Sequence, residues 1–80
     1  SFHTTGAPSM TKLEKIIYLA DHIEEGRIFL GVNKLRKLAF QNLNLAILES
    51  TSMMLQYLLD EKLPIYPKTI ETRNYYLRYL

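Results

Sequence analysis

Two side chains near the start of the sequence, His3 and Asp21, have the chemistry needed to hold a metal ion together. His3 opens the stretch HTTG at residues 3–6, and Asp21 lies in the later stretch LADHIE. An imidazole and a carboxylate both bind hard or borderline divalent cations. Two ligands are too few for a tight site. On the residues alone, the alternative is an ordinary loop histidine and an ordinary aspartate at the border of an apolar helix face.

The rest of HTTG could bind an anion. Hydroxyl groups and backbone N–H groups close to a glycine can surround a phosphate. This makes Thr4, Thr5 and Gly6 candidate substrate contacts. The alternative is that these three residues simply form a turn, since turn positions favour such residue types.

Three further residues are candidates for substrate binding. Lys15 and Arg27 could add positive charge to an anion site, although a single surface lysine is usually only solvated. Asn74, within TRNYY, could hold a loop by hydrogen bonds, or the stretch could be a helix end that packs aromatic side chains. His22 adjoins Asp21 but points about 100° away around a helix, so we expect it not to be a ligand.

The composition limits the classes of protein to which the chain can belong. Its 80 residues form at most one small domain with a modest core. There is no cysteine, which fits a reducing, cytoplasmic setting. A net charge of +2, with scattered basic residues, is too small for a nucleic-acid-binding face. No apolar run approaches the roughly 18 residues that a membrane span needs. We therefore expect a soluble protein that contacts neither nucleic acid nor membrane.

The elements that would position these residues are helices. Thr11 and Glu14 form a capping-box pattern, which predicts a helix over residues 11–25, ended by Gly26. Its apolar residues recur at the helical period: Leu13, Ile16, Ile17, Ala20 and Ile23. Asn33 is placed to cap a short helix through residue 40. No alternating strand pattern occurs, so the predicted fold class is all-α.

A long third helix and a last helix are predicted to follow. Asn42 or Asn44 could cap the long helix, which runs to about residue 62. Two prolines in LPIYP end it, and Pro67 suits the first position of a last helix through residue 79. The polar strip of the long helix is narrow: Glu49, Ser52, Gln56 and Asp60. A helix apolar around most of its circumference is buried on several sides. The chain therefore either forms oligomers or packs against further protein.

Four motifs in this order resemble a known family. They are HTTG, LEKIIYLADHIEEGR (residues 13–27), GVNKLRKLA (residues 31–39) and YPKTIETRNYYL (residues 66–77). Together they make the chain similar to the C-terminal part of the bacterial YqeK-type HD-domain phosphohydrolases, which are similar to symmetrical dinucleoside tetraphosphatases. The resemblance covers nearly the whole chain. It implies a helical HD-domain-like bundle, in which residues 1–80 form the C-terminal portion of a single domain.

The resemblance also implies a nucleotide substrate and a metal site. Enzymes of this family split diadenosine tetraphosphate into two ADP with a divalent metal pair, usually iron. His3 matches the last metal-binding histidine of the family pattern, and Asp21 matches its late aspartate. The residues left as candidate substrate contacts are Thr4, Thr5, Gly6, Lys15, Arg27 and Asn74.

The family pattern has further ligands with no counterpart among the 80 residues. These are an early histidine, a His-Asp doublet and another histidine. We therefore expect the chain alone to be inactive, with a missing N-terminal half or another copy of the chain as its partner. Two other functions stay open: a non-catalytic helical interaction module, and an HD-type nucleotide phosphohydrolase with a different substrate.

Overall fold

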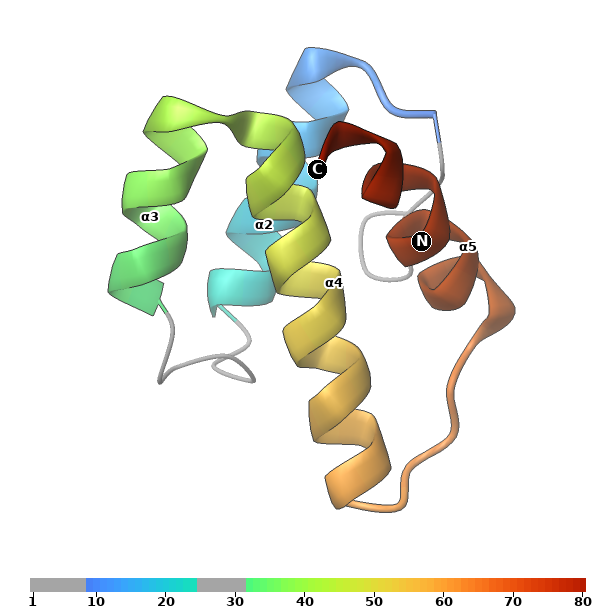
Figure 1. Ribbon diagram of the computed structural model, residues 1–80. Helices are drawn as coiled ribbons and strands as arrows, with labels where there is room; N and C mark the ends of the chain where they lie inside the picture. The colour runs from blue at the N-terminus through green and yellow to red at the C-terminus, as the bar shows by residue number, and fades with distance from the viewer. Residues whose placement is uncertain (1–8, 25–31) are drawn as a thin grey trace.

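The structure is a computed structural model that describes residues 9–24 and 32–80. Its helices are α2 (Lys12–Glu24), α3 (Val32–Gln41), α4 (Leu43–Asp60) and α5 (Pro67–Tyr76), followed by a 3-10 turn, η2 (Leu77–Tyr79). No strand occurs in the described part of the chain (Figure 1). The predicted all-α class is confirmed.

Two of the predicted helix starts are confirmed by their hydrogen bonds. The backbone N–H of Thr11 donates to Glu14 Oε1 at 2.8 Å, and the N–H of Glu14 donates to Thr11 Oγ1 at 3.2 Å. This reciprocal pair is the capping box expected at the start of α2. Asn42, rather than Asn44, caps α4, because its side chain accepts a 3.2 Å hydrogen bond from the N–H of Leu45.

The predicted cap at Asn33 is wrong. α3 already begins at Val32, so Asn33 lies inside the helix. An N-cap residue needs a non-helical backbone, which Asn33 therefore lacks. At the last helix, Pro67 does occupy the first turn, but the α-helix ends at Tyr76 and only a 3-10 turn continues to Tyr79.

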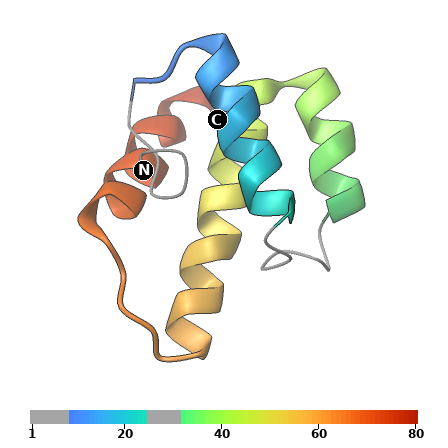
Figure 2. The ribbon, with the colours of Figure 1, turned by 180° about the vertical axis from the view of Figure 1, so that it is seen from behind.

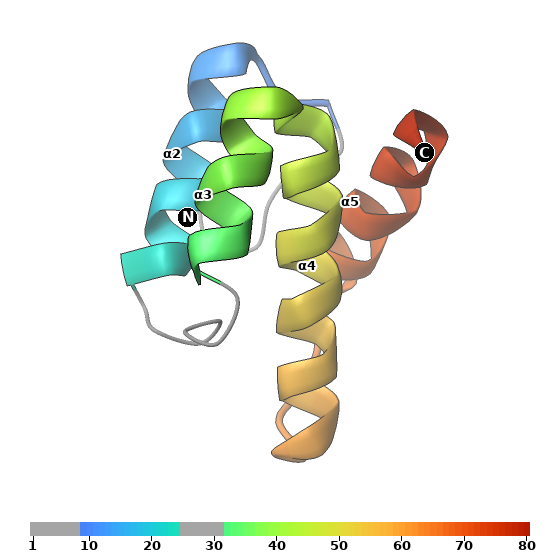
Figure 3. The ribbon, with the colours of Figure 1, turned by 60° about the vertical axis from the view of Figure 1, so that its left-hand side comes forward.

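The central element is α4, against which α2, α3 and α5 all pack. The core cluster joins buried residues from three helices and the segment before them: Met10, Tyr18, Leu19, Ala46, Ile47, Leu48 and Tyr76. The second half of α4 extends beyond α2 and α3 (Figure 3). The prediction that the long helix is buried on several sides is thus confirmed for its first half. No helix in residues 9–24 and 32–80 is long and apolar enough to cross a membrane.

Candidate functional site

The structure describes three of the eight predicted site residues. Asp21 and Lys15 lie on α2, and Asn74 lies on α5. The other five lie outside the described residues: His3, Thr4, Thr5, Gly6 and Arg27. The predicted proximity of the His3 imidazole to the Asp21 carboxylate therefore stays a prediction.

Asp21 has the surroundings expected of a border residue. It lies in the last turn of α2 and is half-buried, next to a helix face that buries Tyr18 and Leu19. A partly desolvated carboxylate favours a nearby cation or hydrogen-bond donor. Within residues 9–24 and 32–80, no group of three or more His, Asp or Glu residues could hold a metal ion. The role of Asp21 as a metal ligand therefore stays a prediction.

Lys15 lies in a contact that the sequence did not predict. Its Nζ donates a hydrogen bond to Asn44 Oδ1 at the start of α4. The same Nζ lies 5.7 Å from the ring centre of Tyr76 and 5.9 Å from that of Tyr79. A cation at this distance from a ring face is attracted to it. Lys15 therefore connects α2 with α4 and with the C-terminal end of the chain.

Three tyrosines gather around that contact. The rings of Tyr75 and Tyr76 are 5.0 Å apart and nearly perpendicular, and those of Tyr76 and Tyr79 are 5.5 Å apart and stacked. Burial raises the pKa of Tyr76 to about 12, an effect that the backbone of Met10 partly opposes. The link between α2 and this tyrosine cluster runs through Lys15, whose Nζ lies near the rings of Tyr76 and Tyr79.

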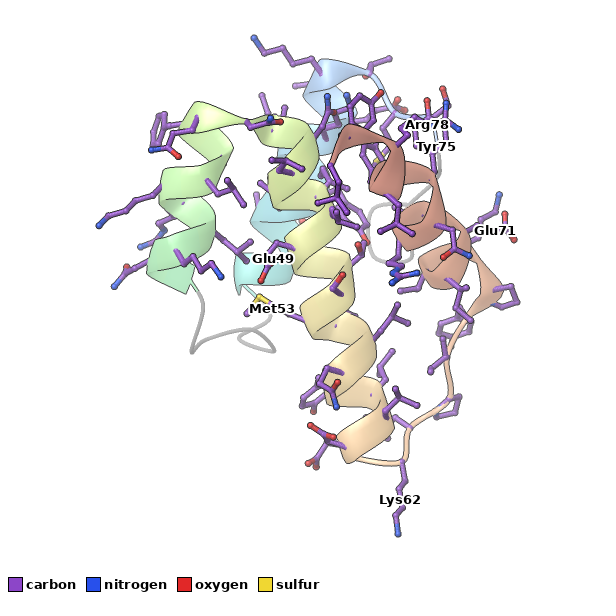
Figure 4. All side chains as sticks on the ribbon, in the orientation of Figure 1. Glu49, Met53, Lys62, Glu71, Tyr75 and Arg78 are labelled. Atoms are coloured by element: carbon purple, nitrogen blue, oxygen red, sulfur yellow. The ribbon has the colours of Figure 1, made fainter. Side chains whose placement is uncertain are left out.

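Asn74 lies beside this cluster on the exposed side of α5. Its Oδ1 accepts a 3.0 Å hydrogen bond from Arg73 Nη1. The next arginine, Arg78, covers the ring of Tyr75, with its Cζ 3.8 Å from the ring centre (Figure 4). The alternative that TRNYY packs aromatic side chains is confirmed, and a loop-holding bond from Asn74 stays a prediction.

The contact of Lys15 with Asn44 and the tyrosines could not be predicted from the sequence. The residues lie far apart in the sequence, and no local pattern links them. Tyr76 and Tyr79 share the helical spacing of three residues that puts side chains on one face. That spacing was the only available signal, and it does not indicate which lysine the face meets.

The helices have the fold of part of an HD superfamily hydrolase. They match the crystal structure of a protein from Clostridium acetobutylicum, described as a predicted HD superfamily hydrolase involved in NAD metabolism, with a TM-score of 0.86. The two chains are 48% identical, and the match covers 99% of this chain and 42% of that one. No family model matches the chain.

Curated relatives make the similarity more specific. The chain is 45% identical over 74 residues to the symmetrical bis(5'-nucleosyl)-tetraphosphatase of Bacillus subtilis, and 52% identical over 73 residues to that of Halalkalibacterium halodurans. The matches cover 92% and 91% of this chain, but only 40% and 39% of the two relatives. The resemblance predicted from the sequence is confirmed, and the chain spans about 40% of the length of the relatives it matches.

Proposed function

We propose that this chain is the C-terminal part of a metal-dependent hydrolase that splits diadenosine tetraphosphate into two ADP. The observation that carries the proposal is the 52% identity, over 91% of the chain, to a protein named as a symmetrical tetraphosphatase. The similar fold of an HD superfamily hydrolase supports it. A cytoplasmic location is part of the proposal, and the cysteine-free sequence supports it.

In this proposal, His3 and Asp21 are two of the ligands of a divalent metal pair, with iron as the proposed metal. The half-buried carboxylate of Asp21 suits a cation ligand, because burial without a cation or donor would be costly. A bound metal pair would supply a water of lowered pKa and neutralise charge on phosphate oxygens. The remaining ligands would come from protein that corresponds to the unmatched length of the relatives.

The same proposal assigns phosphate contacts to residues that precede and follow Asp21 in the sequence. They are Thr4, Thr5, Gly6, Lys15 and Arg27, with Asn74 in support. Hydroxyl and backbone N–H groups would bind the oxygens, and the two cations would oppose the negative charge of the substrate. Lys15 uses one of the three N–H donors of its Nζ on Asn44, so its other donors would be available to phosphate oxygens.

A chimera tests this function. The 74 matched residues of the Bacillus subtilis relative are replaced by the corresponding residues of this chain, and the product is loaded with ferrous iron or manganese. We expect it to convert diadenosine tetraphosphate into ADP alone, while the 80-residue chain is inactive under the same conditions. Chromatography separates ADP from the ATP and AMP that asymmetrical cleavage would give. Robust turnover by the isolated chain would contradict the proposed division of the site.

Two variants of the chimera test the assigned ligand. Loss of a group that only orients a metal ligand costs about 10–100-fold, so we expect Asp21→Asn, which alters a proposed ligand itself, to lower kcat/KM by at least that much. Asp60→Asn is the matched control, since Asp60 is exposed at the far end of α4 and pairs only with Gln56 among the described contacts. A panel with NAD and deoxynucleotides decides between this substrate and another nucleotide.

A further inference from the structure

An apolar groove lies between α2 and α3, the two helices seen side by side from behind in Figure 2. Both helices pack against α4, and a hollow of about 590 Å³ lies between them. Buried Leu19 and Leu35 lie in it, and Ile16 and Phe40 form its sides. Phe40 is 94% exposed and Ile16 is 48% exposed. Single exposed apolar residues are ordinary, but a groove flanked by two of them is a surface suited to binding.

The groove carries positive charge at its edge. Lys12 of α2 and Arg36 of α3 both line it. The sequence of α3, VNKLRKLAFQ, contains three basic residues and no acidic one. Lys34 forms a 3.5 Å ion pair with Glu49 of α4. The positive charges of α3 outside this pair are those of Arg36 and Lys37. An occupant with carboxylates beside an apolar surface therefore complements this edge.

These features argue against a second copy of the chain as the occupant. A symmetrical contact through this groove would place two surfaces against each other whose charged lining residues, Lys12 and Arg36, are both basic, and juxtaposed like charges are costly. A second copy would also leave uncovered several exposed apolar residues at the end of α4 and beyond, among them Leu59, Leu63, Tyr66 and Ile70. The larger part of each relative lies outside its match to this chain, which is enough polypeptide to cover both surfaces.

We propose that the groove is the docking surface for an amphipathic helix from the polypeptide that corresponds to the unmatched length of the relatives. Its apolar residues, at a spacing of three and four, fill the hollow beside Phe40 and Ile16, in the manner of a helix in a groove. Asp or Glu residues beside that apolar face meet Lys12 and Arg36. This inference rests on the proposed function, because it takes the missing part of the hydrolase as the partner.

The test measures binding between two separate polypeptides. One is this chain with a fluorescent label, and the other is the part of the Bacillus subtilis relative outside the 74 matched residues. We expect saturable binding that Phe40→Asp weakens by about tenfold or more, the effect of losing an interface anchor. Gln41→Asp is the matched control, because Gln41 is the exposed neighbour of Phe40 and does not line the groove. It introduces the same charge at the same helix end, and we expect less than about a twofold change.

Charge reversal tests the acidic character of the partner. We expect the double variant Lys12→Glu, Arg36→Glu to weaken binding and to reduce its dependence on salt concentration. Circular dichroism checks that each variant retains its helices, which we expect since Phe40, Lys12 and Arg36 are exposed. Absence of binding by the unaltered chain overturns the proposal, and so does an unchanged affinity of Phe40→Asp.

Two further outcomes separate this inference from others. Sedimentation of the chain alone overturns it if the chain forms a dimer that Phe40→Asp dissociates, since the groove would then be an interface between copies. A complex that forms through the groove but fails to hydrolyse diadenosine tetraphosphate contradicts the proposed function and leaves the docking surface supported. An active chimera supports the proposed function. If the separate partner then binds the Phe40→Asp chain as tightly as the unaltered chain, the docking surface is contradicted.

Discussion

The two halves of α4 are one helix in two different surroundings. The first half, residues 43–51, buries five residues: Ala46, Ile47, Leu48, Ser50 and Thr51. The second half, residues 52–60, has the sequence SMMLQYLLD, with six apolar residues against five in the first half, yet only Met54 is buried there. Leu59 in the second half is 61% exposed, while two hydroxyl side chains in the first half are wholly buried.

This difference shows that neighbouring helices, rather than the residue's own hydropathy, decide which part of α4 is covered. α2, α3 and α5 surround the first half, and the second half extends past α2 and α3 (Figure 3). The buried hydroxyls are tolerated because they bond within the helix. Thr51 Oγ1 donates to the carbonyl of Ile47 at 2.9 Å, and Ser50 Oγ donates to the same carbonyl at 3.1 Å.

The largest predicted effect compares truncation of one apolar side chain in each half. Ile47 is fully buried, so Ile47→Ala leaves a cavity and should lower the free energy of unfolding by about 2–5 kcal/mol. Leu59→Ala removes an exposed side chain and should change it by no more than about 0.5 kcal/mol. Urea denaturation followed by circular dichroism measures both. Equal losses would show that the second half is covered in solution.

The helices could be predicted from local sequence patterns, whereas the candidate site could not. The capping box at Thr11, the prolines around residues 64–67 and the apolar period predicted the helices to within a few residues. Asn33 was misassigned, because a side chain suited to capping does not establish where the backbone becomes helical. The candidate site could be predicted only through family resemblance. A metal site depends on side chains brought together by tertiary structure, and Asp21 alone carries no spacing pattern.

The next effect is expected in alkaline solution, and it concerns a tyrosine packed beside the first half of α4. The folded state holds the pKa of Tyr76 at about 12, above the usual value of about 10. The neutral phenol is favoured by folding, so its contribution is complete below pH 10 and is lost as the pH rises from about 10 through about 12. Unfolding measured across this range should show the loss. Tyr76→Phe should reduce the fall of the free energy of unfolding with rising pH. Tyr66→Phe, at a position 64% exposed, should retain that fall.

A smaller effect is expected at the start of α4. Asn42→Ala removes the side-chain acceptor of the Leu45 N–H, and should lower the free energy of unfolding by about 1 kcal/mol. Asn42→Asp keeps an acceptor and should lie within about 0.5 kcal/mol of the original chain. If the alanine and aspartate variants lose the same stability, the cap is not what fixes the start of the enclosed half.

The smallest effect is expected at the opposite end of α4, where Lys62 points away from the bundle (Figure 4). Lys62 has a φ of 57°, in the left-handed region that favours glycine. The N–H of Leu63 donates to the carbonyl of Leu58 at 2.9 Å, and the N–H of Lys62 donates to that of Leu59 at 3.2 Å. These two bonds define a Schellman motif, which usually has glycine at the position of Lys62.

Lys62→Gly should therefore raise the free energy of unfolding slightly. The substitution removes a left-handed cost of roughly 1–2 kcal/mol, but the greater freedom of glycine in the unfolded chain offsets roughly 0.4–1 kcal/mol of that gain. A net increase of roughly 0–1.6 kcal/mol, with a midpoint of about 0.8 kcal/mol, is expected in urea denaturation. Lys62→Ala keeps the left-handed cost and should give no increase. If glycine gives none either, the last turn of α4 is frayed in solution, and the contrast between the two halves is then one of helix formation as well as of burial.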